Sequence, residues 1–324
     1  QVAACRHLAT AARVKYPVAR SGVFDWQGEQ HISEQRNFIY CFPKSSKGED
    51  HTMKKVLSIA GSDCSGGAGI QADLKTFSAH GVYGMSVIVS VVAENTGRVI
   101  GIQDISADMI GKQIDAVFED IGVDAVKVGM LSTPDCMEEV AGKLKYYHPA
   151  NIVVDPVMYA KNGCPLMEPA AIETLIGTVI PIADVLTPNI PEAEKITGGR
   201  IRTLADMEEA AKAIHTMGCR AVVVKGGHAA GNAVDVLFDG KEICHFDTAR
   251  IDTKNTHGTG CTFSSAVASQ LARGMGLREA VRKAKDYVTM AIGHSLDIGK
   301  GCGPTHHFWH LYQYGLQEER DGGE

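Results

Sequence analysis

The chain has 324 residues, a length that suits one large α/β domain or two modest ones. Hydrophobic residues make up 44% and charged residues 22%, and the net charge of −6 argues against a nucleic-acid partner, which would need a basic face. The longest apolar runs, such as 85–93, are too short to span a bilayer. Nine cysteines without a C-x-x-C pair argue against a disulfide framework or zinc cluster, so we expect a cytoplasmic protein with no membrane partner.

The first 52 residues differ in character from the rest of the chain. Residues 1–24 contain four arginine or lysine side chains and no acidic residue, as in an arginine-rich targeting peptide. We favour a flexible extension, or sequence upstream of a true start at Met53, because Met53-Lys54-Lys55 leads directly into a predicted strand. Residues 53–324 are assigned to a single domain, since no linker-like segment interrupts them.

From Met53 onward, short apolar runs alternate with amphipathic stretches. The runs predicted as strands are 56–60, 86–93, 125–130, 152–157, 185–187 and 221–225. The stretches predicted as helices are 69–80, 109–121, 134–147, 169–180, 191–197, 204–217, 262–273 and 277–295. This alternation predicts a mainly parallel sheet with helices on both faces. Runs 234–238 and 243–246, separated by Asp239-Gly240, predict a β-hairpin.

Ligands of open α/β sheets bind beyond the carboxyl ends of the strands, so the residues that follow each strand are the candidates for a site. The first strand leads into GSDCSGGAG at 61–69, which matches neither a Walker A loop nor a dinucleotide fingerprint. A tight turn and the floor of a small-molecule site both remain open. Asp73, near the start of the next helix, either favours the helix dipole or points a carboxylate into a pocket.

Two carboxylates follow later strands. Asp155 ends an otherwise apolar run, where a carboxylate is costly to bury unless it is paired or bound to a cation. Asn189 suits a helix N-cap, and Glu192 has capping-box spacing from it. The functional alternative is that Asp155 and Glu192 together hold Mg²⁺, mostly through water, beside a nucleoside triphosphate.

Lys225 ends the strand predicted at 221–225 and precedes two glycines. A surface lysine before a turn is the simplest interpretation. The apolar run before it favours a different one, in which the ammonium reaches a phosphate while the glycines let the backbone approach the ligand.

A glycine-rich segment, NTHGTGC at 255–261, precedes the helix predicted at 262–273. Gly258 and Gly260 would let successive N–H groups converge at the helix N-terminus, which predicts an anion hole. The positive helix end is expected to lower the pKa of the Cys261 thiol. A cysteine hydrolase would also need a histidine base, for which His257 is near, but no protease signature surrounds either residue. The lysine and the two carboxylates favour phosphoryl transfer instead.

Taken together, these segments resemble the hydroxymethylpyrimidine kinase/phosphomethylpyrimidine kinase family of thiamine biosynthesis, a branch of the ribokinase superfamily. The matching stretches appear in family order and are IAGSD at 59–63, SGGAGIQADLKT at 65–76, GML at 129–131, VDPVM at 154–158, TPNIPEA at 187–193, KGGH at 225–228, TKNTHGTGCT at 253–262 and GPTHH at 303–307. The resemblance implies a three-layer α/β/α sandwich, ribokinase-like, with a mainly parallel central sheet. It also implies two ATP-dependent phosphorylations, of 4-amino-5-hydroxymethyl-2-methylpyrimidine to the monophosphate and then to the diphosphate.

The resemblance further implies a role for individual residues. Cys261 takes the position at which related sugar kinases use an aspartate as proton acceptor. The residues expected to contact ATP and the transferring phosphoryl group are Lys225, Asn189, Gly258, Thr259 and Gly260. Those expected to line the pyrimidine pocket are Gly61, Ala68, Asp73 and Glu94, while Asp155 and Glu192 would organise Mg²⁺. We also expect a homodimer.

One residue departs from the family pattern. The family usually shows A-Q-N-T after the second strand, where this chain reads Ala93-Glu94-Asn95-Thr96. An ionised glutamate can only accept hydrogen bonds, whereas glutamine both donates and accepts. Glu94 could accept from the 4-amino group and favour a protonated ring nitrogen beside it.

Three other functions stay open beside the pyrimidine kinase. Because related kinases phosphorylate pyridoxal or pyridoxine, a vitamin B6 kinase is the second hypothesis. The others are a non-catalytic nucleotide- or vitamin-binding module and a cysteine hydrolase.

Overall fold

The computed structural model describes residues 52–161, 163–168, 170–227 and 231–315. The predicted N-terminal extension therefore lies almost wholly outside the described residues, as does the histidine that ends the KGGH stretch. The described chain builds one nine-stranded sheet in the order β3-β2-β1-β4-β5-β6-β7-β8-β9.

The strands are β1 Lys55–Asp63, β2 Tyr83–Glu94, β3 Val99–Asp104, β4 Ala125–Val128, β5 Ile152–Val154, β6 Val185–Leu186, β7 Val222–Val224, β8 Ala233–Phe238 and β9 Ile243–Thr248. Strands β1, β2, β4, β5, β6 and β7 pair in parallel. Strand β3 at one edge pairs antiparallel with β2, and at the other edge β8 and β9 pair antiparallel as the predicted hairpin. The prediction of a mainly parallel sheet is confirmed.

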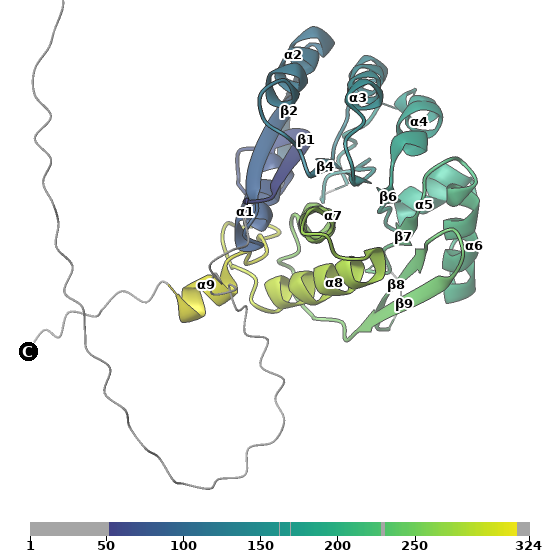
Figure 1. The fold of residues 1–324 in the computed structure, drawn as a ribbon. Coiled ribbons are helices and arrows are strands. Elements are labelled where there is room, and N and C mark those ends of the chain that lie inside the picture. Colours follow the sequence, from purple (N-terminus) through teal and green to yellow (C-terminus); the bar gives the residue numbers. More distant parts are fainter. Residues whose placement is uncertain (1–51, 162, 169, 228–230, 316–324) are drawn as a thin grey trace, which may run out of the picture. The chain divides into compact units, whose positions relative to one another are not determined.

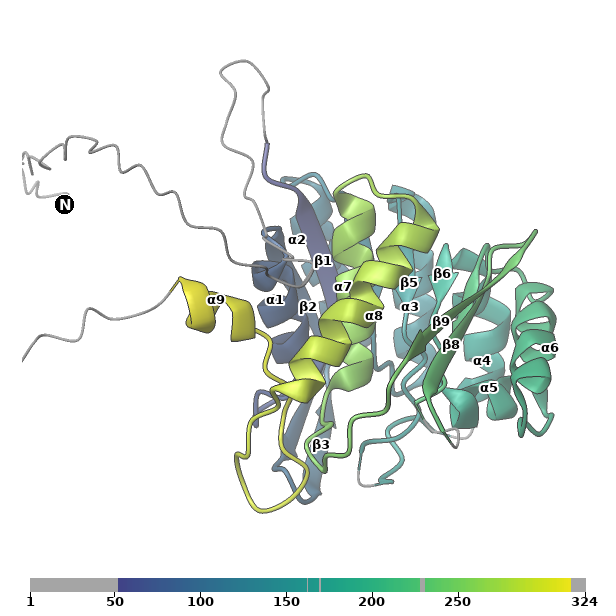
Figure 2. The same cartoon turned by 90° about the horizontal axis from the view of Figure 1, so that it is seen from below.

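Helices cover both faces of this sheet, as Figures 1 and 2 show. The helices are α1 Gly69–Ala79, α2 Ala107–Phe118, α3 Pro134–Tyr147, α4 Ala171–Thr174, α5 Ile190–Thr197, α6 Leu204–His215, α7 Thr259–Ala272, α8 Leu277–Gly293 and α9 Trp309–Tyr314. Helices α2 to α6 pack on one face around a core that includes Ile114, Met137 and Ile214. Helices α1, α7 and α8 pack on the other face around Phe77 and Phe263, which completes three layers.

Three elements differ from the sequence prediction. Strand β3 was not predicted, because it is an edge strand whose residues after Val99 are all exposed and so show no apolar alternation. The helix predicted at 169–180 is α-helical only in α4, and continues as a π turn, Leu175–Val179, and a 3-10 turn, Ile180–Ile182. Pro181 explains the break, because proline has no N–H and its ring clashes with the carbonyl four residues earlier. Helix α9 was not predicted.

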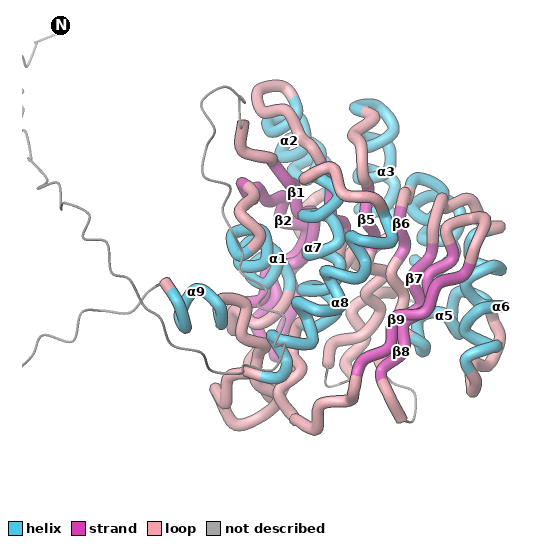
Figure 3. Tube along the Cα trace, turned by 60° about the horizontal axis from the view of Figure 1, so that its bottom comes forward, coloured by secondary structure: helices cyan, strands magenta, loops and turns pink. Residues whose placement is uncertain are grey.

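The strands lie side by side among the helices (Figure 3), and because the central ones are parallel, their carboxyl ends lie at one edge of the sheet. At this edge β1 ends at Asp63 and β2 at Glu94, while Asp155 directly follows β5 and Lys225 directly follows β7. The N-terminus of α7 meets the same edge, since Gly260 lies against Asp155 and Lys225. Within the described ranges, no helix combines the length and apolarity needed to cross a bilayer.

Candidate active site

A cavity of about 570 Å³ opens at the carboxyl edge of the sheet. Its walls include most of the residues that the sequence singled out, namely Ala68, Glu94, Asp155, Asn189, Glu192, Lys225, Gly258, Thr259, Gly260 and Cys261. Gly61 and Asp73 were also predicted to line a substrate pocket, but neither is part of these walls.

Lys225 and Asp155 form a buried ion pair at one side of the cavity. The Lys225 Nζ atom lies 2.6 Å from Oδ1 of Asp155, which also accepts a hydrogen bond from Thr187 Oγ1. Burial acts to lower the pKa of Lys225, but Asp155 and Glu192 outweigh it and hold that pKa above its usual value. The ammonium therefore stays charged, as a phosphate-directed lysine requires.

Glu192 fulfils the capping role and also lies on the cavity wall. Asn189 N donates to Glu192 Oε2 at 2.8 Å, and Glu192 N donates to Asn189 Oδ1 at 3.0 Å, which completes a capping box at the start of α5. Burial, reinforced by the charge of Asp155, raises the pKa of Glu192 to about 7 although Lys225 acts to lower it. A bound cation beside it would favour the ionised form.

The two carboxylates fit a magnesium ion by the chemistry of their oxygens, which are the ligands that this hard cation takes. Oδ2 of Asp155 faces the turn at Gly260, where an added Cβ would lie 3.2 Å from this oxygen and 3.4 Å from Lys225 Nζ. Glycine thus leaves room between the charged groups and the N-terminus of α7. Because Glu192 accepts hydrogen bonds from the backbone of Asn189, contact through water suits it better than direct ligation.

The N-terminus of α7 supplies the anion-binding part of the site. Gly258 is its N-cap with φ +78°, a left-handed conformation that favours glycine, and a Cβ there would collide with the carbonyl oxygen of Gly67. The first N–H groups of a helix have no partner within it. Thr259 N donates to Thr256 O at 3.4 Å, so the amides of Gly260 and Cys261 are the ones that suit an anion. The prediction of a glycine-dependent turn at a helix start agrees with this geometry, although α7 begins at Thr259 rather than at residue 262.

The thiol of Cys261 is less acidic than the sequence indicated. Burial raises its pKa to about 11, although the charge of Lys127 acts in the opposite direction. The carboxylates of Asp73 and Asp155 add to the rise. The prediction that the helix N-terminus lowers this pKa is therefore wrong in net direction, because loss of solvent outweighs the helix dipole. At neutral pH the group is a thiol.

Asp73 lies in the interior and not on the cavity wall. Lys127 Nζ lies 2.8 Å from Asp73 Oδ2, and both side chains are 0% exposed. Ser58 Oγ donates to the same carboxylate at 2.6 Å and Ser265 Oγ at 2.7 Å. With three donors from β1, β4 and α7, the carboxylate joins the helix that carries Cys261 to the sheet. The role of Lys127 was not predicted, although a lysine within the apolar run that forms Ala125–Val128 indicates a buried charge that needs a partner.

A further buried ion pair, between Lys285 and Asp235, supports the loop that follows β7. Lys285 Nζ of α8 lies 2.8 Å from Asp235 Oδ2, and Gly226 N donates to Asp235 Oδ1 at 2.8 Å. A Cβ at Gly226 would collide with the carbonyl oxygen of Val234. The position of Lys225 is thus fixed by contacts of its neighbour that the sequence pattern did not reveal.

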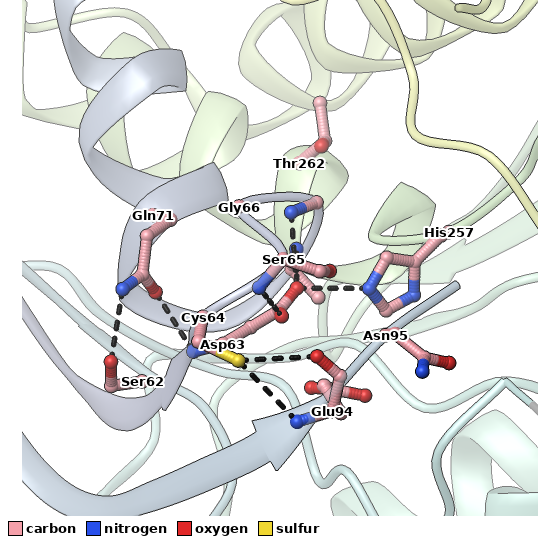
Figure 4. Close-up of polar contacts among 12 residues, drawn as sticks. Ser62, Asp63, Cys64, Ser65, Gly66, Gln71, Glu94, Asn95, His257 and Thr262 are labelled. Carbon is pink, nitrogen blue, oxygen red and sulfur yellow. Dashed lines mark hydrogen bonds and ion pairs between the residues drawn. The ribbon is translucent and has the colours of Figure 1, made fainter. Parts of the chain in front are cut away.

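Asp63, Glu94 and His257 form a cluster (Figure 4), of which Glu94 and His257 belong to the cavity walls. One potential ligand atom from each of the three lies within 4.8 Å of the others. Asp63 was noted only as part of a motif, and His257 only as a possible base for a cysteine hydrolase. His257 Nε2 lies 2.9 Å from Asp63 Oδ2.

Comparison with known proteins places this geometry in context. The sequence model of a family described as Phosphomethylpyrimidine kinase matches residues 63–306. A Rhizobium meliloti protein named hydroxymethylpyrimidine/phosphomethylpyrimidine kinase is 50% identical over 257 residues, which cover 78% of this chain and 96% of that protein. The chain is also 49% identical to the thiamine biosynthesis bifunctional protein ThiED of Geobacter sulfurreducens over 78% of its own residues, but spans only 52% of that protein.

Among solved structures, the chain is similar to an ADP complex of Bacillus subtilis pyridoxal kinase. The sequence identity is 43%, the TM-score is 0.75, and the match covers 79% of this chain and 98% of the other.

Proposed function

The chain belongs to the phosphomethylpyrimidine kinase family, and we propose that it uses ATP to phosphorylate 4-amino-5-hydroxymethyl-2-methylpyrimidine, first to the monophosphate and then to the diphosphate. The observation that carries the proposal is that one cavity brings Lys225 and Asp155 against the N-terminus of α7. This arrangement supplies a fixed cation, a carboxylate suited to a metal and converging N–H groups, which are the parts that phosphoryl transfer needs.

Each part has a definite task in the transfer. The Lys225 ammonium neutralises charge on the phosphates, and the amides after Gly258 hold the oxygens of the transferring group. Asp155 and Glu192 would hold Mg²⁺, which would supply positive charge to offset that of the phosphates. Because Cys261 is a neutral thiol at neutral pH, we expect it to accept a proton only weakly, so alignment and charge neutralisation account for most of the rate.

A vitamin B6 kinase is the second candidate. The solved structure named as a pyridoxal kinase is 43% identical to this chain. Glu94, which stands where the family pattern has glutamine, also lies on the cavity wall. Both substrates carry a hydroxymethyl or equivalent acceptor on a nitrogen-containing ring, so the phosphate-binding part of the site would serve either one.

Kinetics with both compounds would decide between the two candidates. We expect ADP release with saturating Mg-ATP to give a higher kcat/KM for the pyrimidine than for pyridoxal, and the product to be converted to the diphosphate. A higher kcat/KM for pyridoxal would establish the second candidate. A variant with Lys225→Ala is the control for contaminating kinase activity, and absence of any phosphorylated product would support a binding module.

The roles of magnesium and of self-association are also proposals. Removal of divalent cations with a chelator should abolish turnover, and Mg²⁺ should restore it, because the phosphates of ATP would otherwise lie against the carboxylates of Asp155 and Glu192. Sedimentation of the intact protein tests the predicted homodimer.

A further inference from the structure

The cluster of Asp63, Glu94 and His257 joins three separate parts of the chain. Asp63 ends β1, Glu94 ends β2, and His257 directly precedes the turn at Gly258. Potential ligand atoms of the three side chains lie within 4.8 Å of one another, and Figure 4 shows how these side chains face each other. Two carboxyl groups this close cannot both carry a charge without a large cost, unless a proton or a cation lies between them.

Asp63 is the member that keeps its charge. Its Oδ1 accepts from Ser65 N at 2.7 Å, and its Oδ2 accepts from Gly67 N at 3.0 Å, Ala68 N at 2.7 Å and His257 Nε2 at 2.9 Å. Burial acts to raise the pKa of Asp63, but these hydrogen bonds hold it at about 2. A metal ion between the carboxyl groups would have to displace those donors, so a proton is the better occupant.

Glu94 is therefore the member that takes the proton. Burial, together with the charge of Asp63, raises the pKa of Glu94 to about 7, while His257 acts to lower it. The Cys64 thiol, the other titratable group in contact, touches only the backbone of Glu94, with Sγ 3.1 Å from its carbonyl oxygen. Glu94 also forms part of the cavity wall, so its carboxyl group can reach a ligand.

We propose that Glu94 binds the substrate ring as a carboxylic acid, and that Asp63 is the positioning residue that keeps the proton there. The complex then holds one proton between Glu94 and a ring nitrogen. This inference rests on the proposed function and determines specificity within it. A protonated carboxyl group both donates and accepts, as a glutamine amide does, and so matches a ring nitrogen beside an amino group. If the ring nitrogen takes the proton instead, the number of bound protons is the same.

A pH-dependent affinity follows from this count of protons. Below about pH 7 the free enzyme already carries the proton on Glu94, so binding needs none from solvent. Above about pH 7, the formation of each complex takes up one proton from solvent, and kcat/KM for the pyrimidine should fall by about tenfold per pH unit. Titration of Glu192 changes kcat/KM in the opposite direction, because Glu192 must lose its proton to serve a metal. Saturating Mg²⁺ keeps Glu192 ionised, so this residue does not contribute to the fall of kcat/KM at high pH, which we call the descending limb.

The first test compares the wild-type protein with Glu94→Gln, whose amide has the same shape but does not titrate. At saturating Mg-ATP, wild-type kcat/KM for the pyrimidine should fall about tenfold between pH 7.5 and 8.5, whereas the E94Q profile should stay flat there. Superimposable profiles would overturn the inference while leaving the kinase function intact. If neither protein phosphorylates the pyrimidine at any pH, the proposed function itself has failed.

Calorimetry gives a readout that does not depend on turnover. The pyrimidine is titrated into the protein at pH 8.5 in two buffers that differ in ionisation enthalpy. The difference should show uptake of about one proton by the wild-type protein and none by E94Q. Zero uptake by the wild-type protein would refute the inference.

The contribution of Asp63 is tested with Asp63→Asn, which should move the descending limb to lower pH because the neighbouring negative charge is lost. Asp104→Asn is the matched control, since Asp104 accepts hydrogen bonds from Ser90 and Ser132 and not from the Glu94 cluster, and its limb should not move. If Asp63→Asn does not fold, the E94Q comparison and the calorimetry still decide the question. An unmoved limb in a folded Asp63→Asn protein would remove Asp63 from the proposal.

Discussion

The Lys127 ammonium lies 2.8 Å from the Asp73 carboxylate in the interior, and neither side chain is exposed to solvent. Burial acts to lower the pKa of Lys127, but the charge of Asp73 outweighs it and raises that pKa, so the pair is ionic. With Ser265 as a further donor, the pair connects α7 to the sheet directly behind Cys261. Removal of one partner of such a buried pair lowers the stability more than replacement of both partners by apolar residues.

We therefore expect Lys127→Met to destabilise the protein by about 3–5 kcal/mol, because Asp73 would remain as an unpaired buried charge. The double variant Lys127→Met with Asp73→Leu should recover part of that loss. Chemical unfolding measures the free energies of unfolding of the wild type, the single variant and the double variant. Lys112→Met is the control and should change the stability little, since Lys112 pairs with Asp108 on the surface. A single variant as stable as the wild type would show that the pair is not ionic.

Substitution of Lys225 should affect the transition state more than the fold. We expect Lys225→Ala to lower kcat/KM by about 10²–10³-fold, the loss typical of one electrostatic donor to the reacting group. The surface variant Lys212→Ala, in α6, should behave as wild type in the same assay of ADP release. Undiminished kcat/KM in Lys225→Ala would refute its phosphate role, and thermal unfolding shows whether a loss arises from misfolding.

Cys261→Ala should lower kcat with little effect on the KM for ATP. We expect a loss of about tenfold, below the 10²–10⁴ range of an efficient general base, because a thiol with a pKa near 11 is ionised to the order of 10⁻⁴ at pH 7. If the thiolate is the acceptor, wild-type kcat should also rise with pH, and the alanine variant should lack that rise. Full kcat in the variant would exclude the thiol as proton acceptor, so that only the α7 amides of this loop would contribute to catalysis.

Asp63 should make the protein sensitive to acid. Its pKa is about 2 in the folded protein against the usual 3.8, so folding favours the ionised form. The resulting stability, at most about 2 kcal/mol, is present above pH 4 and is lost as the pH falls through 2. Urea unfolding at pH 6 and pH 2.5 should show a smaller difference for Asp63→Asn than for the wild type. An equal difference would mean that Asp63 has the same pKa in the folded and unfolded chain.

Much of the fold could be predicted from the sequence because its signals are local. Apolar runs about five residues long mark buried parallel strands, and the polar residue after each run must reach the same edge of the sheet. Asp155 and Lys225 were found in this way. Strand β3 could not be predicted, because an exposed edge strand lacks apolar alternation, whereas the early end of α4 was missed although Pro181 is a local signal for it.

The sequence by itself thus determined the layered sheet, the glycine turn before α7 and the residue types that gather at the carboxyl edge of the sheet. Only the tertiary structure decided which of those side chains keep contact with solvent and with one another. Asp73 was removed from the pocket by its pairing with Lys127, burial raised the pKa of Cys261, and Glu94 was brought beside Asp63. Each of these outcomes depends on burial and on distances between charges in separate segments, and neither quantity is a local property of the chain.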